Sequence, residues 1–489
     1  MNRGIESKVI LRHKTAIQRS GLSRPLRLAW EAELFSDSDS VFDYGCGKGG
    51  DLSILRQLGI TCSGWDPVHL PDSVRSAADI VNLGYVVNVI EDPLERVGAL
   101  RQAWELTRRV LVVSARLEVE AKGTNHQEFG DGCLTRRDTF QKFYSQHELR
   151  EWINTSLSVD ATAAAPGVFF VFRDEQLRQT FGAARYRRTS SPIQPTSGAQ
   201  YEQHREMLDP LSAFFTDRGR LPHSSELDLT DIQRLFGSPK RAFGLIQRVT
   251  GVDQWDHIRD ERTQDLLVYL ALAVFTKRAS FSALPFPLQC DVKAFCGTYA
   301  EACRRADELL YSAGNTATVN AACGAAPFGK LTHDALYIHN SGLSALPPIL
   351  RVFEGCARNY VGVVEGANLI KLHRFKPKVS YLSYCDFDVD PHPALSGALV
   401  VPLDTFDVKY WNYKDSTNPP ILHRKEEFVP SGYPGREKFS KLTKQEEKYG
   451  LFAETQRIGH REEWMNELKA RGVALRGHRL VQIREPDCA

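Results

Sequence analysis

The stretch with the clearest chemical spacing runs from Asp43 to Gly49, Asp-Tyr-Gly-Cys-Gly-Lys-Gly. An acid stands two residues before alternating glycines, between an apolar run (41–42) and a helical pattern that starts at Asp51. Glycines in such a strand-to-helix turn bring backbone amides close to a ligand, because no Cβ stands in the way. Asp43 can accept hydrogen bonds from an amino group, whereas it would repel the pyrophosphate of the alternative dinucleotide fingerprint over 45–50. A glycine turn without a ligand is the other alternative.

Asp66 is the second candidate for ligand binding. It ends a strand-like run over 60–65 and is followed directly by Pro67. A carboxylate about twenty residues past the glycines can accept hydrogen bonds from both hydroxyls of a ribose. A turn cap is the alternative, and the spacing favours the ribose.

Further candidates for the site lie at the end of the next apolar strand, residues 79–85, and in the segment after it. Asn82, Leu83 and Gly84 close this strand, and Asn88 and Glu91 lie in the segment beyond it. In a parallel sheet the ligand lies at the carboxyl ends of the strands, so all these groups are expected at one edge. Asn88 and Glu91 come nearest to the expected position of the reacting group, although neither can be assigned a role.

The elements that must position these residues alternate between strand and helix. Apolar strands are expected at 41–44, 60–65, 79–85 and 110–114, with helices after 51 and after 93, the latter turning Leu94, Leu100 and Trp104 inward. Near-continuous apolar strands of this kind form a parallel sheet covered on both faces. Twelve residues separate Asp66 from Asp79, too few for a further helix and strand, so a shortened sheet edge is expected. Residues 168–172 predict a final antiparallel strand at or near an edge.

These motifs resemble those of class I S-adenosylmethionine (SAM)-dependent methyltransferases, with their Asp-x-Gly-x-Gly-x-Gly signature. Over nearly its full length the chain is similar to the methyltransferase family associated with DNA phosphorothioation systems. The matching stretches are 13–17, 23–26, 42–47, 64–67, 81–85, 88–91, 386–388, 390–393 and 421–426. The resemblance implies a Rossmann-like fold that binds SAM. The residues implied for the cofactor are Asp43, Tyr44, Gly45, Cys46, Gly47, Gly49, Asp51, Asp66, Pro67, Asn82, Leu83 and Gly84.

Composition limits the function classes. With 42% hydrophobic and 25% charged residues, the 489-residue chain has an ordinary globular composition and is long enough for two or three cores. The net charge of +2 means that any basic surface must be local. Ten cysteines without a regular framework favour reduced thiols in a cytoplasmic protein, without structural zinc. The longest apolar run, 266–275, is about half of what a bilayer span needs, so no membrane partner is expected.

Five regions follow from the patterns along the chain. They are a basic N-terminal arm (1–30), a SAM-binding methyltransferase domain (31–175), a linker (176–205), a helical domain (206–330) and a C-terminal α+β domain (331–489). The arm is either a solvated helix or a phosphate-facing lip beside the cofactor pocket. Residues 231–243 predict two short helices around a Gly-Ser-Pro turn, which form either a DNA-reading helix-turn-helix or part of an ordinary helical bundle.

The α+β region combines strand-like runs with two charged clusters. The runs are 359–364, 369–373, 379–385, 397–403 and 406–413. Lys371 and Arg374 belong to a dense basic strand, and with Arg12 and Lys14 of the arm they are candidates for binding nucleic acid.

Asp386, Asp388, Asp390 and His392 form the second cluster and would share one face of an extended chain. Hard oxygen ligands and one imidazole suit a divalent cation such as Mg²⁺ or Mn²⁺. A solvated Asp-Pro turn is the alternative, and it is slightly favoured.

The sequence thus predicts a SAM-dependent methyltransferase whose C-terminal half recognises its substrate. The family resemblance favours nucleic acid in a bacterial DNA-modification or defence setting, with a possible associated modification system as partner. Two alternatives stay open. One is a small-molecule or protein methyltransferase, and the other is a non-catalytic module that binds SAM and recognises nucleic acid.

Overall fold

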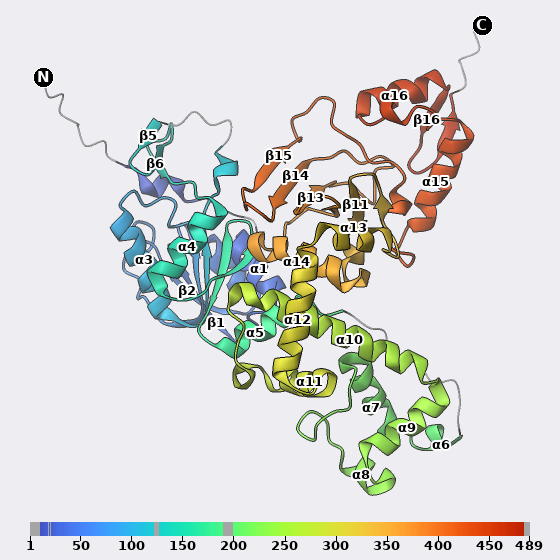
Figure 1. The fold of residues 1–489 in the computed structure, drawn as a ribbon. Coiled ribbons are helices and arrows are strands. Elements are labelled where there is room, and N and C mark those ends of the chain that lie inside the picture. The colour runs from blue at the N-terminus through green and yellow to red at the C-terminus, as the bar shows by residue number, and fades with distance from the viewer. Residues whose placement is uncertain (1–9, 18, 20, 122–126, 189–198, 484–489) are drawn as a thin grey trace, which may run out of the picture. The chain divides into compact units, whose positions relative to one another are not determined.

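The computed structural model describes residues 10–17, 19, 21–121, 127–188 and 199–483 (Figure 1). The chain forms two compact units. The first contains the residues up to 181 together with 358–365, and the second contains 182–357 and the residues from 366 onwards. Apart from residues 358–365, the predicted helical and α+β regions therefore fall in one unit. Within the part of the chain that is described, no helix has the length and apolar character needed to cross a membrane.

The first unit is built on a six-stranded sheet of order β2-β1-β3-β4-β9-β8. The strands β1 to β4 are parallel, and β9 and β8 are antiparallel to their neighbours. The elements are η1 Arg12–Thr15, α1 Arg24–Glu31, β1 Ser40–Tyr44, α2 Gly50–Gln57, β2 Thr61–Trp65, β3 Ala78–Gly84, α3 Pro93–Leu106, β4 Thr107–Ser114, α4 Gln146–Leu157, β8 Thr162–Ala165, β9 Val168–Phe172 and α5 Glu175–Ala184. A small sheet of β5 Gln127–Phe129, β6 Gly132–Leu134 and β7 Phe140–Gln141 stands apart.

Alternate residues of the large sheet enter two cores, one on each face. Phe42, Val81 and Leu111 pack with α3 and α4, whereas their neighbours Val41, Ile80 and Val110 pack with α1 and α2. This is the period-two alternation expected of strands that are covered on both faces. The Rossmann-like fold, the antiparallel β9 and the shortened edge at β2 are all as predicted, and β8 is an additional edge strand.

Leu94 was expected to face the core, and this expectation is wrong. Its side chain is 82% exposed, whereas Leu100 is fully buried. Helical residues advance by about 100° each, so six positions rotate Leu94 about 120° away from Leu100. Leu94 occupies the first turn of α3, where the Asp92 carboxylate caps its N–H group.

Residues 358–365 complete the first unit from far along the sequence. The Val363 N–H donates to Ala164 O (2.8 Å) of the edge strand β8, and Gln146 Nε2 donates to Tyr360 O (3.2 Å). Glu365 forms ion pairs with Arg24 and Arg27 of α1. A Cβ on Gly362 would lie 2.4 Å from the Ala164 backbone, so this close approach requires glycine.

The second unit begins with a helical region and ends in an antiparallel sheet of order β10-β11-β12-β13-β14-β15. Its helices are α6 Ala199–Gln203, α7 Arg205–Arg218, α8 Thr230–Phe236, α9 Pro239–Thr250, α10 Asp253–Leu272, α11 Phe286–Cys296, α12 Tyr299–Ala313, α13 Thr316–Gly324, α14 Pro348–Val361, α15 Arg436–Lys448 and α16 Arg461–Ala470. Its strands are β10 Lys330–Leu331, β11 Ala335–His339, β12 Leu369–His373, β13 Lys378–Ser383, β14 Gly397–Pro402, β15 Lys409–Asn412, β16 Val473–Leu475 and β17 Leu480–Gln482. The strand predicted at 359–364 is wrong, because α14 continues to Val361.

The predicted pair of short helices at 231–243 is present as α8 and α9. They meet at Gly237, whose φ of +76° ends α8, and the Ser238 side chain caps α9. Ala242, Phe243 and Ile246 of α9 are buried, whereas Lys240 and Arg241 are exposed. DNA reading by this pair stays a prediction.

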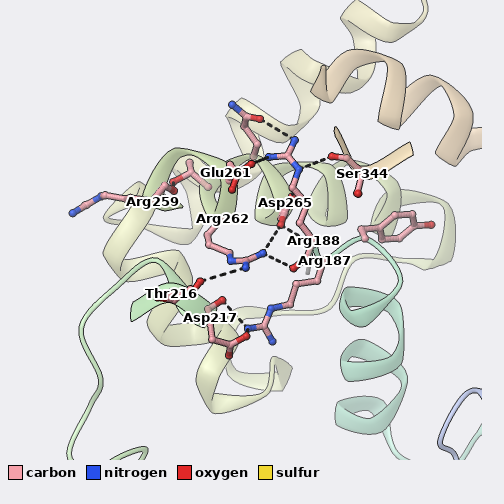
Figure 2. Close-up of polar contacts among 12 residues, drawn as sticks. Arg187, Arg188, Thr216, Asp217, Arg259, Glu261, Arg262, Asp265 and Ser344 are labelled. Atoms are coloured by element: carbon pink, nitrogen blue, oxygen red, sulfur yellow. Dashed lines mark hydrogen bonds and ion pairs between the residues drawn. The ribbon is translucent and has the colours of Figure 1, made fainter. Parts of the chain in front are cut away.

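A buried carboxylate ties three parts of the second unit together. Asp265 of α10 accepts from Arg351 Nη1 of α14 (2.7 Å), from Arg262 Nη1 (3.2 Å) and from the Arg188 N–H (3.0 Å). Figure 2 shows Asp265 beside the guanidinium groups of Arg188 and Arg262. Asp217 and Arg187 form a separate pair nearby, in which Asp217 is 63% exposed.

Candidate functional site

A pocket of about 470 Å³ opens at the carboxyl ends of β1, β2 and β3. Most residues predicted to bind the cofactor line it, namely Asp43, Tyr44, Gly45, Cys46, Gly47, Asp51, Asp66, Pro67, Asn82 and Gly84. Gly49 and Leu83 do not: Gly49 is the N-cap of α2, and Leu83 is fully buried in the core. Residues from three separate strand ends thus share one cavity, as expected for a parallel sheet.

The turn after β1 can be formed only with glycine at its first position. Gly45 has a φ of +81°, and a Cβ there would lie 2.5 Å from Val86 Cγ2. The N–H groups of Gly45 and Cys46 both donate to Trp65 O, at 2.8 and 3.1 Å, which fixes the turn against β2. The backbone of this turn forms one wall of the pocket.

Asp43 and Asn82 form a buried polar pair in this pocket. Asn82 Nδ2 donates to Asp43 Oδ1 at 2.8 Å, and the two side chains are 4% and 2% exposed. Burial raises the pKa of Asp43 to about 7, and the neighbouring Asp51 adds to the rise. Asn82 Oδ1 is buried and has no partner among the described residues. A buried acid and an unsatisfied amide oxygen together fit a ligand that donates hydrogen bonds and carries positive charge.

Asp66 is held rigidly at the end of β2. Its carboxylate accepts from the N–H groups of Gly47 (3.0 Å), Val68 (2.9 Å) and His69 (2.8 Å). The last two are turn hydrogen bonds, so Asp66 does cap the turn that follows β2. The same carboxylate lines the pocket and is linked to the glycine turn. Its orientation is therefore set before any ligand arrives.

An aromatic wall completes the pocket, and sequence patterns did not identify all of it. The ring centroids of Tyr44 and Trp65 lie 5.3 Å apart, and the Arg75 guanidinium lies 3.7 Å from the Trp65 centroid. Gln102 Oε1 accepts from Tyr44 Oη at 2.7 Å and from Arg75 Nη1 at 2.6 Å. Arg75 and Gln102 carry no local motif, so only the fold reveals their position.

Residues 12, 13, 15–17 and 19 also line the pocket. Arg12 donates to both Glu91 (Nε, 2.8 Å) and Glu95 (Nη1, 2.6 Å), so its guanidinium is already paired with carboxylates. Burial opposes the ionisation of Glu91, but the Arg12 hydrogen bond, a backbone hydrogen bond and the Arg12 charge together outweigh burial and hold the pKa of Glu91 below its usual value. Arg12 is therefore a structural clamp in this conformation, whereas Lys14 is exposed. Binding of nucleic acid by either residue stays a prediction.

The two residues proposed for catalysis, Asn88 and Glu91, do not line the pocket. Asn88 is 1% exposed and its Nδ2 donates to Gln141 Oε1 at 3.2 Å, while its backbone oxygen accepts from the Lys142 N–H. Glu91 is held by Arg12. Their catalytic roles stay predictions, and in this geometry both support the pocket wall from outside.

The structure supports the slightly favoured turn over the metal site at Asp386, Asp388, Asp390 and His392. Residues 386–390 form a turn in which Asp386 O accepts from the Val389 and Asp390 N–H groups, so the chain is not extended and its side chains do not alternate. Asp388 accepts from Tyr433 Oη at 2.8 Å, whereas the buried His392 pairs with Glu446 Oε1 at 2.6 Å. No group of three or more His, Cys, Asp or Glu side chains converges to hold a metal within the described ranges.

Divalent cations are accordingly expected to leave the melting temperature unchanged, since a cation that binds the folded state would raise it by mass action. The measurement is a thermal melt in EDTA, Mg²⁺ and Mn²⁺. The Asp386→Ala/Asp388→Ala/Asp390→Ala variant should respond as the wild type does. A metal-dependent rise that this variant loses would restore the metal site.

The basic strand residues Lys371 and Arg374 differ in their surroundings. Arg374 is fixed by Asn320 Oδ1 (2.8 Å) and by the backbone oxygens of Thr332 (2.6 Å) and His333 (3.0 Å). The Lys371 ammonium instead lies 5.1 Å from the Tyr337 ring centroid. Arg374 thus stabilises the fold, and Lys371 stays the better candidate for a ligand contact.

The fold and pocket define a Rossmann-like α/β domain with a ligand site at the carboxyl edge of its parallel strands. No protein-family model and no curated protein matches the chain.

Solved structures similar to the chain include three methyltransferases. One is a 1,6-didemethyltoxoflavin N1-methyltransferase from Burkholderia thailandensis with bound S-adenosylhomocysteine (12% identity, 33% of this chain, 78% of that chain, TM-score 0.23). Another is a sugar N-methyltransferase from Streptoalloteichus (11% identity, 32% of this chain, 96% of that chain, TM-score 0.23). The third is a SAM-dependent methyltransferase from Aquifex aeolicus (14% identity, 31% of this chain, 89% of that chain, TM-score 0.21).

Proposed function

We propose that the chain is a SAM-dependent methyltransferase. The observation that carries this proposal is the buried pair of Asp43 and Asn82, which shares a pocket with the glycine turn and Asp66. Asp43 and Asn82 would hold the amino group of the methionine moiety, and Asp66 would accept from the ribose hydroxyls. The backbone of the Gly45 turn would lie close to the cofactor, since the wall has no side chain at that point.

SAM supplies an electrophilic methyl group on a sulfonium centre. The residues of this chain contribute binding and orientation, because methyl transfer requires the acceptor atom to be aligned with the methyl group. A base is needed only where the acceptor must lose a proton. The rigid hydrogen bonds of Asp66 and the clamp formed by Arg12 favour such a fixed orientation.

As the methyl acceptor we propose nucleic acid in a bacterial DNA-modification or defence setting. The resemblance to the family associated with DNA phosphorothioation supports this acceptor. A small-molecule or protein methyltransferase is the rival within the enzyme class. A nucleic-acid-binding module that retains SAM without turnover is the rival from another class.

Turnover of SAM to S-adenosylhomocysteine distinguishes these functions. Purified protein is incubated with SAM and with nucleic acid, a metabolite extract or a protein extract from the same cells. S-adenosylhomocysteine is expected to form in the mixture with nucleic acid and in neither of the other two. Product only with one of the other two extracts would favour the first rival, and SAM binding without turnover in any mixture would favour the second. An Asp66→Ala sample is the control for product that does not come from this pocket.

A further inference from the structure

The antiparallel sheet of the second unit uses its two faces differently. On one face Ile370, Leu372, Val379 and Val401 are all buried, at 4% exposure or less. Tyr381 of the same face donates its hydroxyl to Glu354 Oε1 of α14 at 2.9 Å, so this helix packs against that side. The opposite face is mixed: Leu369 and Leu382 pack into a second apolar cluster at one end of the strands, and polar residues lie towards the other end.

Lysines lie in rows across that opposite face. Residues paired directly across an antiparallel ladder point to the same side. The pairing places Tyr337, Lys371, Ser380, Val400 and Lys409 in one row across β11 to β15. Lys378 lies two residues from Ser380 and therefore points to the same side. His373 lies two residues from Lys371 and points to that side as well. We call Lys371, Lys378 and Lys409 with these neighbours the lysine face.

The positive charge of the lysine face is poorly compensated. Within the described residues Lys371 and Lys378 have no ion pair, and Lys409 lies 3.6 Å from Asp407. Burial followed by Lys376, Lys371 and Lys409 lowers the pKa of Lys378 below its ordinary value. The neighbouring acid Asp334 is already paired with His333 Nδ1 at 2.7 Å. Like charges gathered on one face repel each other unless an anion binds among them.

Two exposed aromatic side chains flank the lysine face. Phe375 lies in the connection between β12 and β13 and is 52% exposed, and Trp411 lies on the edge strand β15 and is 56% exposed. The Arg374 guanidinium lies 5.2 Å from the Phe375 centroid, which supports this ring at the surface. Exposed aromatics beside cations are the combination that stacks on unpaired bases and tracks their phosphates.

We propose that the lysine face is a binding platform for single-stranded nucleic acid. The three lysines would contact phosphates, and Phe375 and Trp411 would stack on bases at its margins. A single strand suits this surface better than a duplex, because bases held in a duplex offer no free faces to the aromatics. This inference rests on the proposed function, which names nucleic acid as the methyl acceptor. Binding of nucleic acid to the lysine face itself requires no methyl transfer.

The test measures fluorescence anisotropy of labelled oligonucleotides on the full chain, without SAM and across a salt series. The oligonucleotides are a 12-mer of single-stranded DNA, the same sequence as RNA, and a hairpin duplex. In the Lys371→Ala/Lys378→Ala/Lys409→Ala variant, single-strand affinity should fall by about 10–100-fold at moderate salt. The slope of log affinity against log salt should become shallower by about 2, since each lost phosphate contact on a single strand contributes about 0.7.

The matched control removes the same charge from another surface of the same unit. Lys441→Ala/Lys444→Ala/Lys448→Ala changes three exposed lysines of α15 and should leave affinity and slope at the wild-type level. Trp411→Ala and Phe375→Ala should each weaken binding by about fivefold or more without changing the salt slope. Circular dichroism confirms that each variant is folded.

Three results would overturn the platform. They are equal losses in the lysine-face and α15 variants, tighter binding of the duplex than of the single strands, or displacement by polyglutamate as efficient as by unlabelled oligonucleotide. The last result would point to an acidic protein partner. Calorimetric SAM binding by the lysine-face variant separates this failure from failure of the proposed function, because the pocket contains none of the substituted residues.

Discussion

Replacement of Asp265 by alanine is expected to lower the unfolding free energy of the second unit by about 3–5 kcal/mol, the cost of leaving buried charges without their partner. Asp265 is 6% exposed and accepts from Arg351 and Arg262, which are themselves 4% exposed. The change would leave these guanidinium groups in a site from which water is largely excluded. Because they come from α14 and α10, the loss should affect both helices together.

The measurement is urea denaturation followed by tryptophan fluorescence, with amide hydrogen exchange of α10 and α14 to locate the effect. The matched control is Asp217→Ala, which removes the partner of Arg187 from a surface pair and should cost no more than about 1 kcal/mol. An Asp265→Ala protein that matched this control would show that the network contributes little to stability.

The second large effect concerns the cofactor. Asp43→Ala and Asp66→Ala are each expected to weaken SAM binding by about 2–4 kcal/mol, because each leaves polar ligand groups unpaired in the pocket. Isothermal titration calorimetry measures the change. Affinities within threefold of wild type for both variants would refute the cofactor assignment.

The pKa of Asp43 adds a pH dependence with a definite sign. Only the ionised carboxyl binds an ammonium group, and its pKa in the free protein is about 7. SAM affinity should therefore rise by up to about tenfold per pH unit below pH 7 and level off above it. It should fall again once the α-amino group of SAM loses its own proton near pH 8. Asp43→Asn should remove the increase of SAM affinity with pH. Asp66→Asn should weaken SAM binding but leave its pH dependence unchanged.

The same group affects the stability of the free protein. The folded-state pKa of Asp43 lies above the ordinary value of 3.8, so the folded state binds the proton more tightly. Its contribution to stability should therefore decline as the pH rises from about 4 to about 7 and stay constant above that. Thermal melts of Asp43→Asn should lack this component, which checks the pKa without any ligand.

Sequence patterns predicted the Rossmann-like sheet because its signals are local. The glycine turn and the apolar strands each lie within a short stretch, and the residue pattern of that stretch alone predicts its structure. The error at 359–364 arose for a related reason, since Val361, Val363 and Val364 form a short β-branched run that suits either a strand or a buried helix end. Gly362, with a φ of +77°, ends α14 at that point.

The parts of the site that escaped prediction depend on contacts between distant residues. Arg12 meets Glu91 and Glu95 across 79 and 83 positions, and nothing in either stretch signals the other. Asp388 and His392 carry suitable metal-binding groups, but a turn and the distant Glu446 direct them elsewhere. Residue type predicted what these side chains can do, and only tertiary structure decides which partner each one meets.

The completion of the first unit by residues 358–365 has a consequence for biosynthesis. When residue 181 leaves the ribosome, the edge strand β8 still lacks the Val363 hydrogen bond, and Arg24 and Arg27 still lack Glu365. At about 5–20 residues per second, translation of the intervening residues takes about 10–35 s. The nascent first unit therefore has an incompletely paired sheet edge until much of the second unit has been synthesised.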